Sequence, residues 1–199
     1  MVNGTPKSAG IFTVDASGDL SQSGFQVSEA DLSIATAYIL TIEPSPDNDP
    51  NPSDVHILAG DFNASTAALS VSHPAALGSD FTSATGKYIL ATPTDMDTTN
   101  EASGVWWLDP AAGPGAGLML PTLPAGWKYE GWAVINGMPL STGTFTDAMM
   151  ADDAAPFSGP NAGPPFPGED FLQNAPSGTI FPTDLRGDVV VISVEPVPD

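Results

Sequence analysis

The sequence predicts an all-β protein made of two pseudo-repeated antiparallel β-sandwich-like (Ig-like) units with Pro/Gly-rich loops. Three observations lead to this prediction. The 21 Pro and 20 Gly residues are spread along all 199 positions and separate short apolar runs, which is typical of short strands and tight turns. Several of these runs alternate apolar and polar residues with the period of two that a half-buried strand requires. Two blocks of sequence recur in the same order, which indicates an internal repeat.

The repeat is visible in two pairs of segments. VNGTPKSAGIF at 2–12 matches INGMPLSTGTF at 135–145, with Asn, Gly, Pro, Ser, Gly and Phe at the same offsets. YILTIEPSPD at 38–47 matches VVISVEPVPD at 190–199. We therefore place a first β unit with connecting strands at 1–86 and a second β unit at 87–199. The first lacks the front strand YEGWAV of the second, and the second stops where the first continues at 48–62, so we interpret Met1 as the start of a fragment.

The elements follow from local patterns. Apolar and polar alternation or β-branched runs predict strands at residues 9–14, 37–43, 55–62, 67–72, 88–92, 104–108, 118–120, 128–135, 141–146 and 188–195. SEADL within 28–36 predicts one capped helical turn, and 170–174 is a second candidate. The segment 149–176 is rich in Pro, Gly and Ala and is predicted to be a loop inserted into the second unit.

Turn chemistry supports a hairpin in each unit. Asn136-Gly137 and Asn3-Gly4 are strong signals for a type I′ turn, because both central residues of that turn need a positive φ. Gly143 and Gly10 each stand two residues before a Phe, which predicts a bulge or a close approach under an aromatic ring.

Once these residues are set out, the paired blocks resemble a known family. The second block carries Leu120, Pro121, Leu123, Pro124, Gly126, Tyr129, Trp132, the hairpin residues 137–145 and the final Glu195-Pro196. This pattern resembles the extracytoplasmic C-terminal domain of anti-sigma-K factors. The doubled form is similar to that of uncharacterised secreted proteins or lipoproteins of marine bacteria. The resemblance implies a β fold and an extracellular or cell-envelope location. The pair Glu130-Gly131 departs from the Gln-Leu that is usual in the family.

The charge balance limits the classes of partner. The chain has 24 acidic and four basic residues, a formal net charge of -20. Such a surface repels nucleic acid and anionic membranes, whereas divalent cations are plausible partners. The simpler interpretation is a solvated acidic surface that keeps the protein soluble. The chain has no cysteine and no apolar run of the roughly 20 residues that a membrane span needs.

Two acidic loops are candidates for a Ca²⁺ site. The first, PDNDPNPSD, offers Asp47, Asp49, Asn51 and Asp54, with Asn48 between them, and the second offers Asp95 and Asp97. Side-chain oxygens at such density are ligands that Ca²⁺ accepts. The alternative is that Asp, Asn and Pro are the residues that turns prefer. Four acids of the insert, Asp152, Asp153, Glu169 and Asp170, form a weaker candidate.

The aromatic residues suggest binding rather than catalysis. His56 and His73 lack a nucleophile or a metal-ligand spacing, so we predict that the chain is not an enzyme. Trp106 and Trp107 must face opposite sides of a strand, which predicts that one of them is exposed as a platform for a glycan or a protein partner. In the competing interpretation the Pro-rich insert covers that Trp.

These observations predict a non-enzymatic extracytoplasmic or secreted module for binding or for envelope structure, with Ca²⁺ as an optional stabiliser. One alternative is a subunit that self-assembles into filaments or strand-swapped oligomers through open sheet edges. A further alternative is the sensor domain of a regulatory membrane protein, as the resemblance implies.

Overall fold

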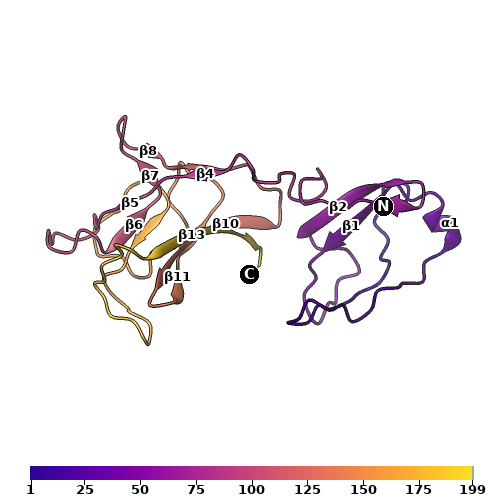
Figure 1. Ribbon diagram of the computed structural model, residues 1–199, viewed down its shortest axis with the longest axis horizontal. Helices are drawn as coiled ribbons and strands as arrows, with labels where there is room; N and C mark the ends of the chain where they lie inside the picture. The colour runs from indigo at the N-terminus through magenta and orange to yellow at the C-terminus, as the bar shows by residue number, and fades with distance from the viewer. Residues whose placement is uncertain (199) are drawn as a thin grey trace. The chain divides into compact units, whose positions relative to one another are not determined.

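The computed structural model describes residues 1–198 and confirms that the chain is mostly β, with several small antiparallel sheets and one short helix (Figure 1). The chain divides into two compact units. Unit 1 contains Met1–Asp80 and Pro124–Gly126, and unit 2 contains Phe81–Leu123 and Trp127–Asp199. Sandwich-like packing and the repeat stay predictions.

Unit 1 is a three-stranded sheet with long connections. Its strands β1 (Ala37–Thr41), β2 (His56–Asn63) and β3 (Thr66–Ala67) lie in the order β1-β2-β3. The predicted helical turn is confirmed as α1 (Glu29–Leu32), whose N-cap Ser28 accepts a hydrogen bond from the backbone N–H of Asp31. The predicted strand at 9–14 is reduced to one bridge between Val14 and Leu20.

Unit 2 is built on the long strand β10 (Trp127–Ile135), which lies between β11 (Met138–Phe145) and β13 (Val189–Pro196). A second sheet has the order β12-β6-β5 and contains β12 (Gly168–Asp170), β6 (Gly104–Trp106) and β5 (Ile89–Leu90). Two separate two-stranded sheets complete unit 2. They pair β4 (Thr85–Gly86) with β9 (Leu118–Met119), and β7 (Leu108–Asp109) with β8 (Gly115–Ala116).

Both predicted hairpin turns are present. Asn136 and Gly137 have φ values of 53° and 80° and join Ile135 to Met138. Asn3 and Gly4 have φ values of 49° and 75°, between a bridge that pairs Val2 with Thr5. Asn and Gly tolerate this left-handed backbone, which explains their choice at both turns.

The two bulge glycines behave differently. In β11 the register shifts so that Gly131 faces Gly143 and Trp132 faces Ser141, which leaves Thr142 as the extra residue of a bulge. The predicted bulge is therefore confirmed at Gly143, where a Cβ would meet the Asp152 carboxyl at 2.6 Å. On Gly10 a Cβ would lie 2.2 Å from the ring of Phe25, so that prediction is right.

The insert is irregular over most of its length, as its composition predicts, but three of its residues join a sheet. Residues 168–170 form β12, which pairs with β6, and the helical turn predicted at 170–174 is therefore wrong. Phe157, Phe171 and Phe181 pack together, with ring centroids 5.4 to 5.7 Å apart. These rings belong to the main core of unit 2, whose fully or largely buried members are Val105, Trp107, Leu118, Tyr129, Ala133, Ile135, Leu140, Phe145, Phe171 and Leu185.

Apolar burial is concentrated in unit 2. In unit 1 the buried apolar side chains are the small ones of Val2, Val55, Ala59 and Ala76. Eight larger apolar residues of unit 1 are exposed: Ile11, Val14, Leu20, Val27, Leu32, Ile34, Ile42 and Leu69. Across residues 1–198, none of the helical structure is long and apolar enough to cross a membrane.

Candidate functional site

The first acidic loop uses its carboxylates to hold its own backbone. Asp47 Oδ1 accepts the N–H of Asp49 at 2.9 Å, and Asp49 Oδ1 accepts the N–H of Asn51 at 2.9 Å. The hydrogen bonds from the backbone and then the side chain of Asn51 hold the pKa of Asp49 below its usual value. Within residues 1–198, no three His, Asp or Glu side chains gather closely enough to hold a metal ion. The carboxylates of Asp47 and Asp49 therefore cap turns, and calcium binding at Asp47, Asp49, Asn51 and Asp54 stays a prediction.

The second acidic loop is folded in the same way. Asp95 Oδ1 accepts the N–H of Asp97 at 3.1 Å, and Asp97 Oδ1 accepts the N–H of Thr99 at 2.8 Å. The side chain and backbone of Thr99 lower the pKa of Asp97. Asn100 Nδ2 donates to Asp95 Oδ2 at 2.7 Å, which closes the turn.

Trp106 and Trp107 do not form an exposed platform. Each is only 4% exposed, and they belong to different clusters: Trp106 packs with Leu108 and Phe166, and Trp107 lies in the main core. The insert covers Trp106, because a Cβ on Gly163 would lie 2.3 Å from its indole ring. The prediction of one exposed Trp is wrong, since the insert folds into a layer that excludes water from Trp106.

Asp170 is a buried carboxylate that joins three segments of unit 2. It is 0% exposed and stands at the end of β12. Its Oδ1 accepts from Trp106 Nε1 at 2.8 Å, and its Oδ2 accepts from the backbone N–H of Thr94 at 2.8 Å. Burial raises the pKa of Asp170, and the bonds from Thr94 and Trp106 oppose that rise. In the sequence Asp170 is only one of the four acids of the insert, and its partner Thr94 is 76 positions away.

Glu169 and Asp152 form a pair of acids that ionise with difficulty. Burial raises the pKa of each to about 7, and the charge of Asp152 adds to the rise at Glu169. Ser158 donates to Glu169 Oε1, whereas Glu169 Oε2 is buried and finds no hydrogen-bond partner in residues 1–198. Asp152 Oδ2 accepts the N–H of Gly168 at 2.8 Å, which fixes the start of β12.

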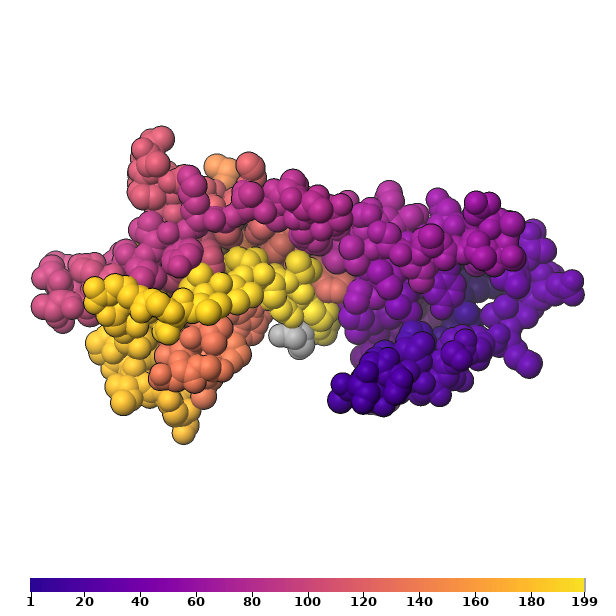
Figure 2. Space-filling model, viewed as in Figure 1, coloured from indigo at the N-terminus to yellow at the C-terminus, as the bar shows by residue number. Residues whose placement is uncertain are grey.

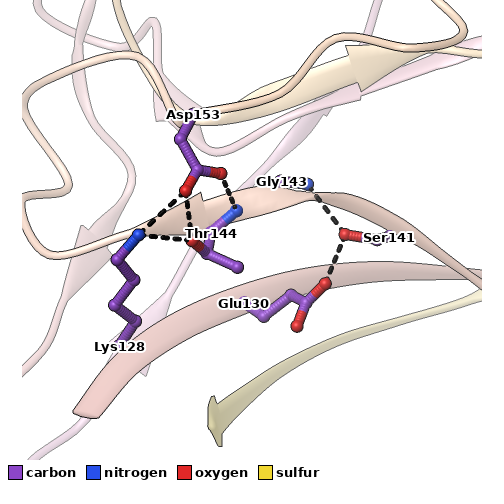
Figure 3. A network of polar contacts seen from close by, with 6 residues as sticks. All are labelled: Lys128, Glu130, Ser141, Gly143, Thr144 and Asp153. Atoms are coloured by element: carbon purple, nitrogen blue, oxygen red, sulfur yellow. Dashed lines mark hydrogen bonds and ion pairs between the residues drawn. The ribbon is translucent and has the colours of Figure 1, made fainter. Parts of the chain in front are cut away.

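A neighbouring polar network attaches the insert to the hairpin of β10 and β11 (Figure 3). Asp153 Oδ2 accepts from Lys128 Nζ at 2.9 Å, and Asp153 Oδ1 accepts the N–H of Thr144 at 2.8 Å. Burial raises the pKa of Asp153, but the bonds from Thr144 and Lys128 outweigh it and lower the value to about 2. Beside it, Ser141 donates to Glu130 and accepts the N–H of Gly143. The four acids of the insert therefore have structural partners.

The two histidines have local partners in unit 1. His56 Nδ1 lies 2.9 Å from the carbonyl oxygen of Ala75, and His73 Nδ1 accepts the N–H of Ala75 at 3.1 Å. Asp61 Oδ1 lies 3.6 Å from His73 Nε2. These contacts fasten the loop at residues 73–76 against β2.

An apolar groove runs along one face of β13. Its volume is about 450 Å³, and its lining is Phe81, Ala84, Thr85, Gly86, Tyr88, Trp107, Leu118, Leu120, Tyr129, Val190, Ile192 and Val194. Every second residue of β13 enters this lining, because alternate side chains of a strand share a face. Tyr88 is 45% exposed at its rim. We call this feature the β13 groove.

The outer edge of β13 is open. In the described part of the chain, β13 pairs with β10 alone and ends the order β11-β10-β13. On its other face Val189 and Val191 are 60% and 40% exposed. The C-terminal region that contains β13, yellow in Figure 2, lies at the surface. An apolar strand with an unpaired edge is a template for another strand.

A second hollow, of about 510 Å³, is mostly polar and is lined by residues 98–103 together with Leu90, Pro182, Thr183, Asp184 and Arg186. Its only cation is already engaged, because Arg186 forms an ion pair with Asp184. Those bonds lower the pKa of Asp184 to about 2. The β13 groove is therefore the stronger candidate for a binding surface.

No family model, no curated protein and no solved structure matches the chain. The resemblance to the anti-sigma-K domain accordingly stays an expectation that rests on the residues of the paired blocks.

Proposed function

We propose that this chain is a protein-binding module of an extracytoplasmic or secreted protein, without enzymatic activity, and that it holds its partner at the β13 groove. The observation that carries the proposal is the contrast between this surface and the rest of the chain. The formal net charge is -20, yet the groove is lined by apolar and aromatic side chains next to an open strand edge. Apolar surface of this kind marks interaction sites in soluble proteins. The location outside the cytoplasm rests on the sequence resemblance alone.

Selection from a displayed library of random linear peptides tests this proposal. Binders are selected on the whole chain and then measured on three folded variants. Tyr88→Ala removes the rim of the groove, Val191→Lys places a charge beside the open edge, and Val14→Lys places the same charge on exposed surface of unit 1. We expect binders that both unit 2 variants weaken and Val14→Lys leaves unchanged. A selection without any binder that depends on Tyr88 or Val191 contradicts the proposal.

Self-assembly is a second candidate, and a specific observation favours it. Unit 1 has eight exposed apolar residues and few buried ones, and association with other copies would bury exposed apolar surface. Size-exclusion chromatography with light scattering is the test. A concentration-dependent mass above 20.4 kDa supports assembly, and a monomeric mass across the accessible concentration range would contradict assembly.

Calcium stabilisation is also a proposal, because the loops of Asp47–Asp54 and Asp95–Asp97 remain rich in carboxylate and amide oxygens. A ligand that binds the native state alone raises the melting temperature. We expect a higher melting temperature in millimolar Ca²⁺ than in EDTA, and a smaller rise in Asp49→Ala. Equal melting temperatures in both solutions would contradict calcium binding.

A further inference from the structure

Every lysine and arginine of the chain already has an acidic partner. The four ion pairs are Lys7–Asp31, Lys87–Asp109, Lys128–Asp153 and Arg186–Asp184. In the first two pairs the lysine Nζ lies 2.5 Å from a carboxylate oxygen, and in the third it lies 2.9 Å away. Because the sequence has 24 acids and four bases, these pairs leave a formal net charge of -20. The long-range electrostatic field of the chain is therefore negative.

The imbalance of charge is sharper in unit 1 than in unit 2. Unit 1 contains ten acids and one base, Lys7, whereas unit 2 contains 14 acids and three bases. All ten acids of unit 1 lie in the described residues, and none of them is buried. Exposed carboxylates are ionised at neutral pH, so with neutral histidines unit 1 has a formal net charge of -9.

Unit 1 has little apolar burial to offset the repulsion among these acids. Its buried apolar side chains are those of Val2, Val55, Ala59 and Ala76, and eight larger ones are exposed. The free energy of folding is a small difference between large opposing terms even in a well-packed domain. A large net charge destabilises the compact state through self-repulsion, so charge weighs heavily on the stability of unit 1.

The range of this repulsion depends on salt. A unit of about 80 residues has a radius of gyration of about 12 Å. The Debye length is about 30 Å at 0.01 M salt, so each acid of the unit acts on all the others, and about 3 Å at 1 M salt, where only adjacent charges interact. Salt also weakens the pair of Lys7 and Asp31, but an exposed ion pair contributes little to stability.

We infer that ionic strength controls the folding of unit 1, which reaches its full stability only when salt screens its carboxylates. The cations act as a diffuse atmosphere around the unit and are not coordinated at one site. Screening would act in this way whether or not a partner binds at the β13 groove.

Unit 2 is expected to respond less to salt. It contains both large apolar clusters, and three ion pairs that salt weakens. Burial raises the pKa of Asp152 and Glu169 to about 7, so these two acids do not carry their full charge at neutral pH. Unit 2 therefore serves as an internal reference in the same sample.

Amide hydrogen exchange of the whole chain, followed residue by residue by NMR at pH 7 with EDTA present, tests the inference. In unit 1 the N–H of Ala59 donates to Ser70 and the N–H of Phe62 donates to Thr36. We expect exchange of both amides to slow by at least about tenfold between 0.01 M and 1 M NaCl. Exchange at Ala133, in the central strand of unit 2, should slow less. EDTA removes any contribution of bound Ca²⁺.

Two variants separate screening of charge from a general effect of salt on apolar burial. Asp19→Asn removes one exposed charge, so at 0.01 M NaCl it should slow exchange at Ala59 by at least about twofold. Asp31→Asn removes an equal charge together with the attraction to Lys7, so it should slow exchange less.

Three results would each overturn the inference. The first is exchange in unit 1 that is unchanged or faster in 1 M NaCl. The second is an equal slowing at Ala59 and Ala133, which would give unit 1 no special dependence on salt. The third is Asp19→Asn that exchanges no more slowly than the wild type at 0.01 M NaCl, because repulsion among the acids would then not limit the stability of unit 1.

Discussion

Asp170 is the residue on which the second sheet of unit 2 depends most clearly. Its carboxylate is fully buried and accepts hydrogen bonds from β6 and from the segment around Thr94. Removal of one partner of a buried, charge-assisted bond leaves the remaining donors desolvated and unpaired. The side chain therefore stabilises the fold even though burial raises its pKa.

We expect Asp170→Ala to lower the free energy of unfolding by about 3 kcal/mol, because three donors of Thr94 and Trp106 lose their acceptor. Urea unfolding followed by Trp fluorescence reports this directly, since all four Trp residues lie in unit 2. Asp147→Ala, at an exposed position of the same unit, is the control. A loss equal to that of the control would show that Asp170 has no special role.

The raised pKa values of Asp152 and Glu169 make the stability of the fold depend on pH. Their folded pKa values are near 7, above the usual value of a carboxyl group, so the native state binds protons more tightly than the unfolded state. Their contribution to stability is complete below about pH 4 and is lost as the pH rises to about 7, at up to about 1.4 kcal/mol per pH unit for each group. The low pKa values of Asp153 and Asp184 act in the opposite direction, and only at more acidic pH.

The free energy of unfolding is therefore expected to fall between about pH 4 and pH 7. Asp152→Asn keeps an oxygen for the N–H of Gly168 and removes the ionisation, so its slope should be shallower than that of the wild type. Asp147→Asn, exposed in the same segment, should leave the slope unchanged. Parallel slopes for the wild type and Asp152→Asn would contradict this explanation.

Burial of single acids could not be predicted from the sequence, for a physical reason. Asp170 and its partner Thr94 are 76 positions apart, and the burial of an isolated carboxylate is decided by such long-range partners. The acidic loops show the converse. For Asp47 and Asp49 the turn alternative to the Ca²⁺ prediction could be recognised, because a short side chain that caps its own backbone needs only neighbours in sequence.

Among the elements, the length of a strand decides whether the sequence predicts it. The long strands β2, β10, β11 and β13 and the two Asn-Gly turns were predicted, because several alternating residues or a positive φ leave a local signature. Strands β4, β8 and β12 contain two or three residues and have no periodicity to recognise. Only the strand at 168–170 within the otherwise irregular insert was missed for this reason.

The insert packs closely on Trp106 at Gly163. A Cβ on Gly163 would lie 2.3 Å from the ring of Trp106, a distance that forces the insert or the indole to move. We expect Gly163→Ala to lower the free energy of unfolding by about 1–3 kcal/mol. Gly115→Ala is the control, since its nearest neighbours lie at 3.9 Å. Equal stability of the two variants would mean that the insert does not pack on Trp106.

The whole molecule combines one well-packed unit with one that buries little. Unit 2 holds the large apolar clusters, the buried acids and the β13 groove, whereas unit 1 exposes eight large apolar side chains and buries only Val2, Val55, Ala59 and Ala76. In the described residues β13 has no partner strand at its outer edge, and the β13 groove lies along one face of the same strand. The central claim is that this edge is available to a partner strand.

Amide hydrogen exchange of the isolated chain, measured residue by residue by NMR, tests that claim most directly. In an edge strand every second N–H points away from the sheet and exchanges with solvent, whereas a central strand protects its amides on both sides. The account predicts fast exchange at alternate residues of β13 and continuous protection in the interior of β10. Uniform protection along β13, equal to that of β10, would show that the edge is already occupied and would contradict the account.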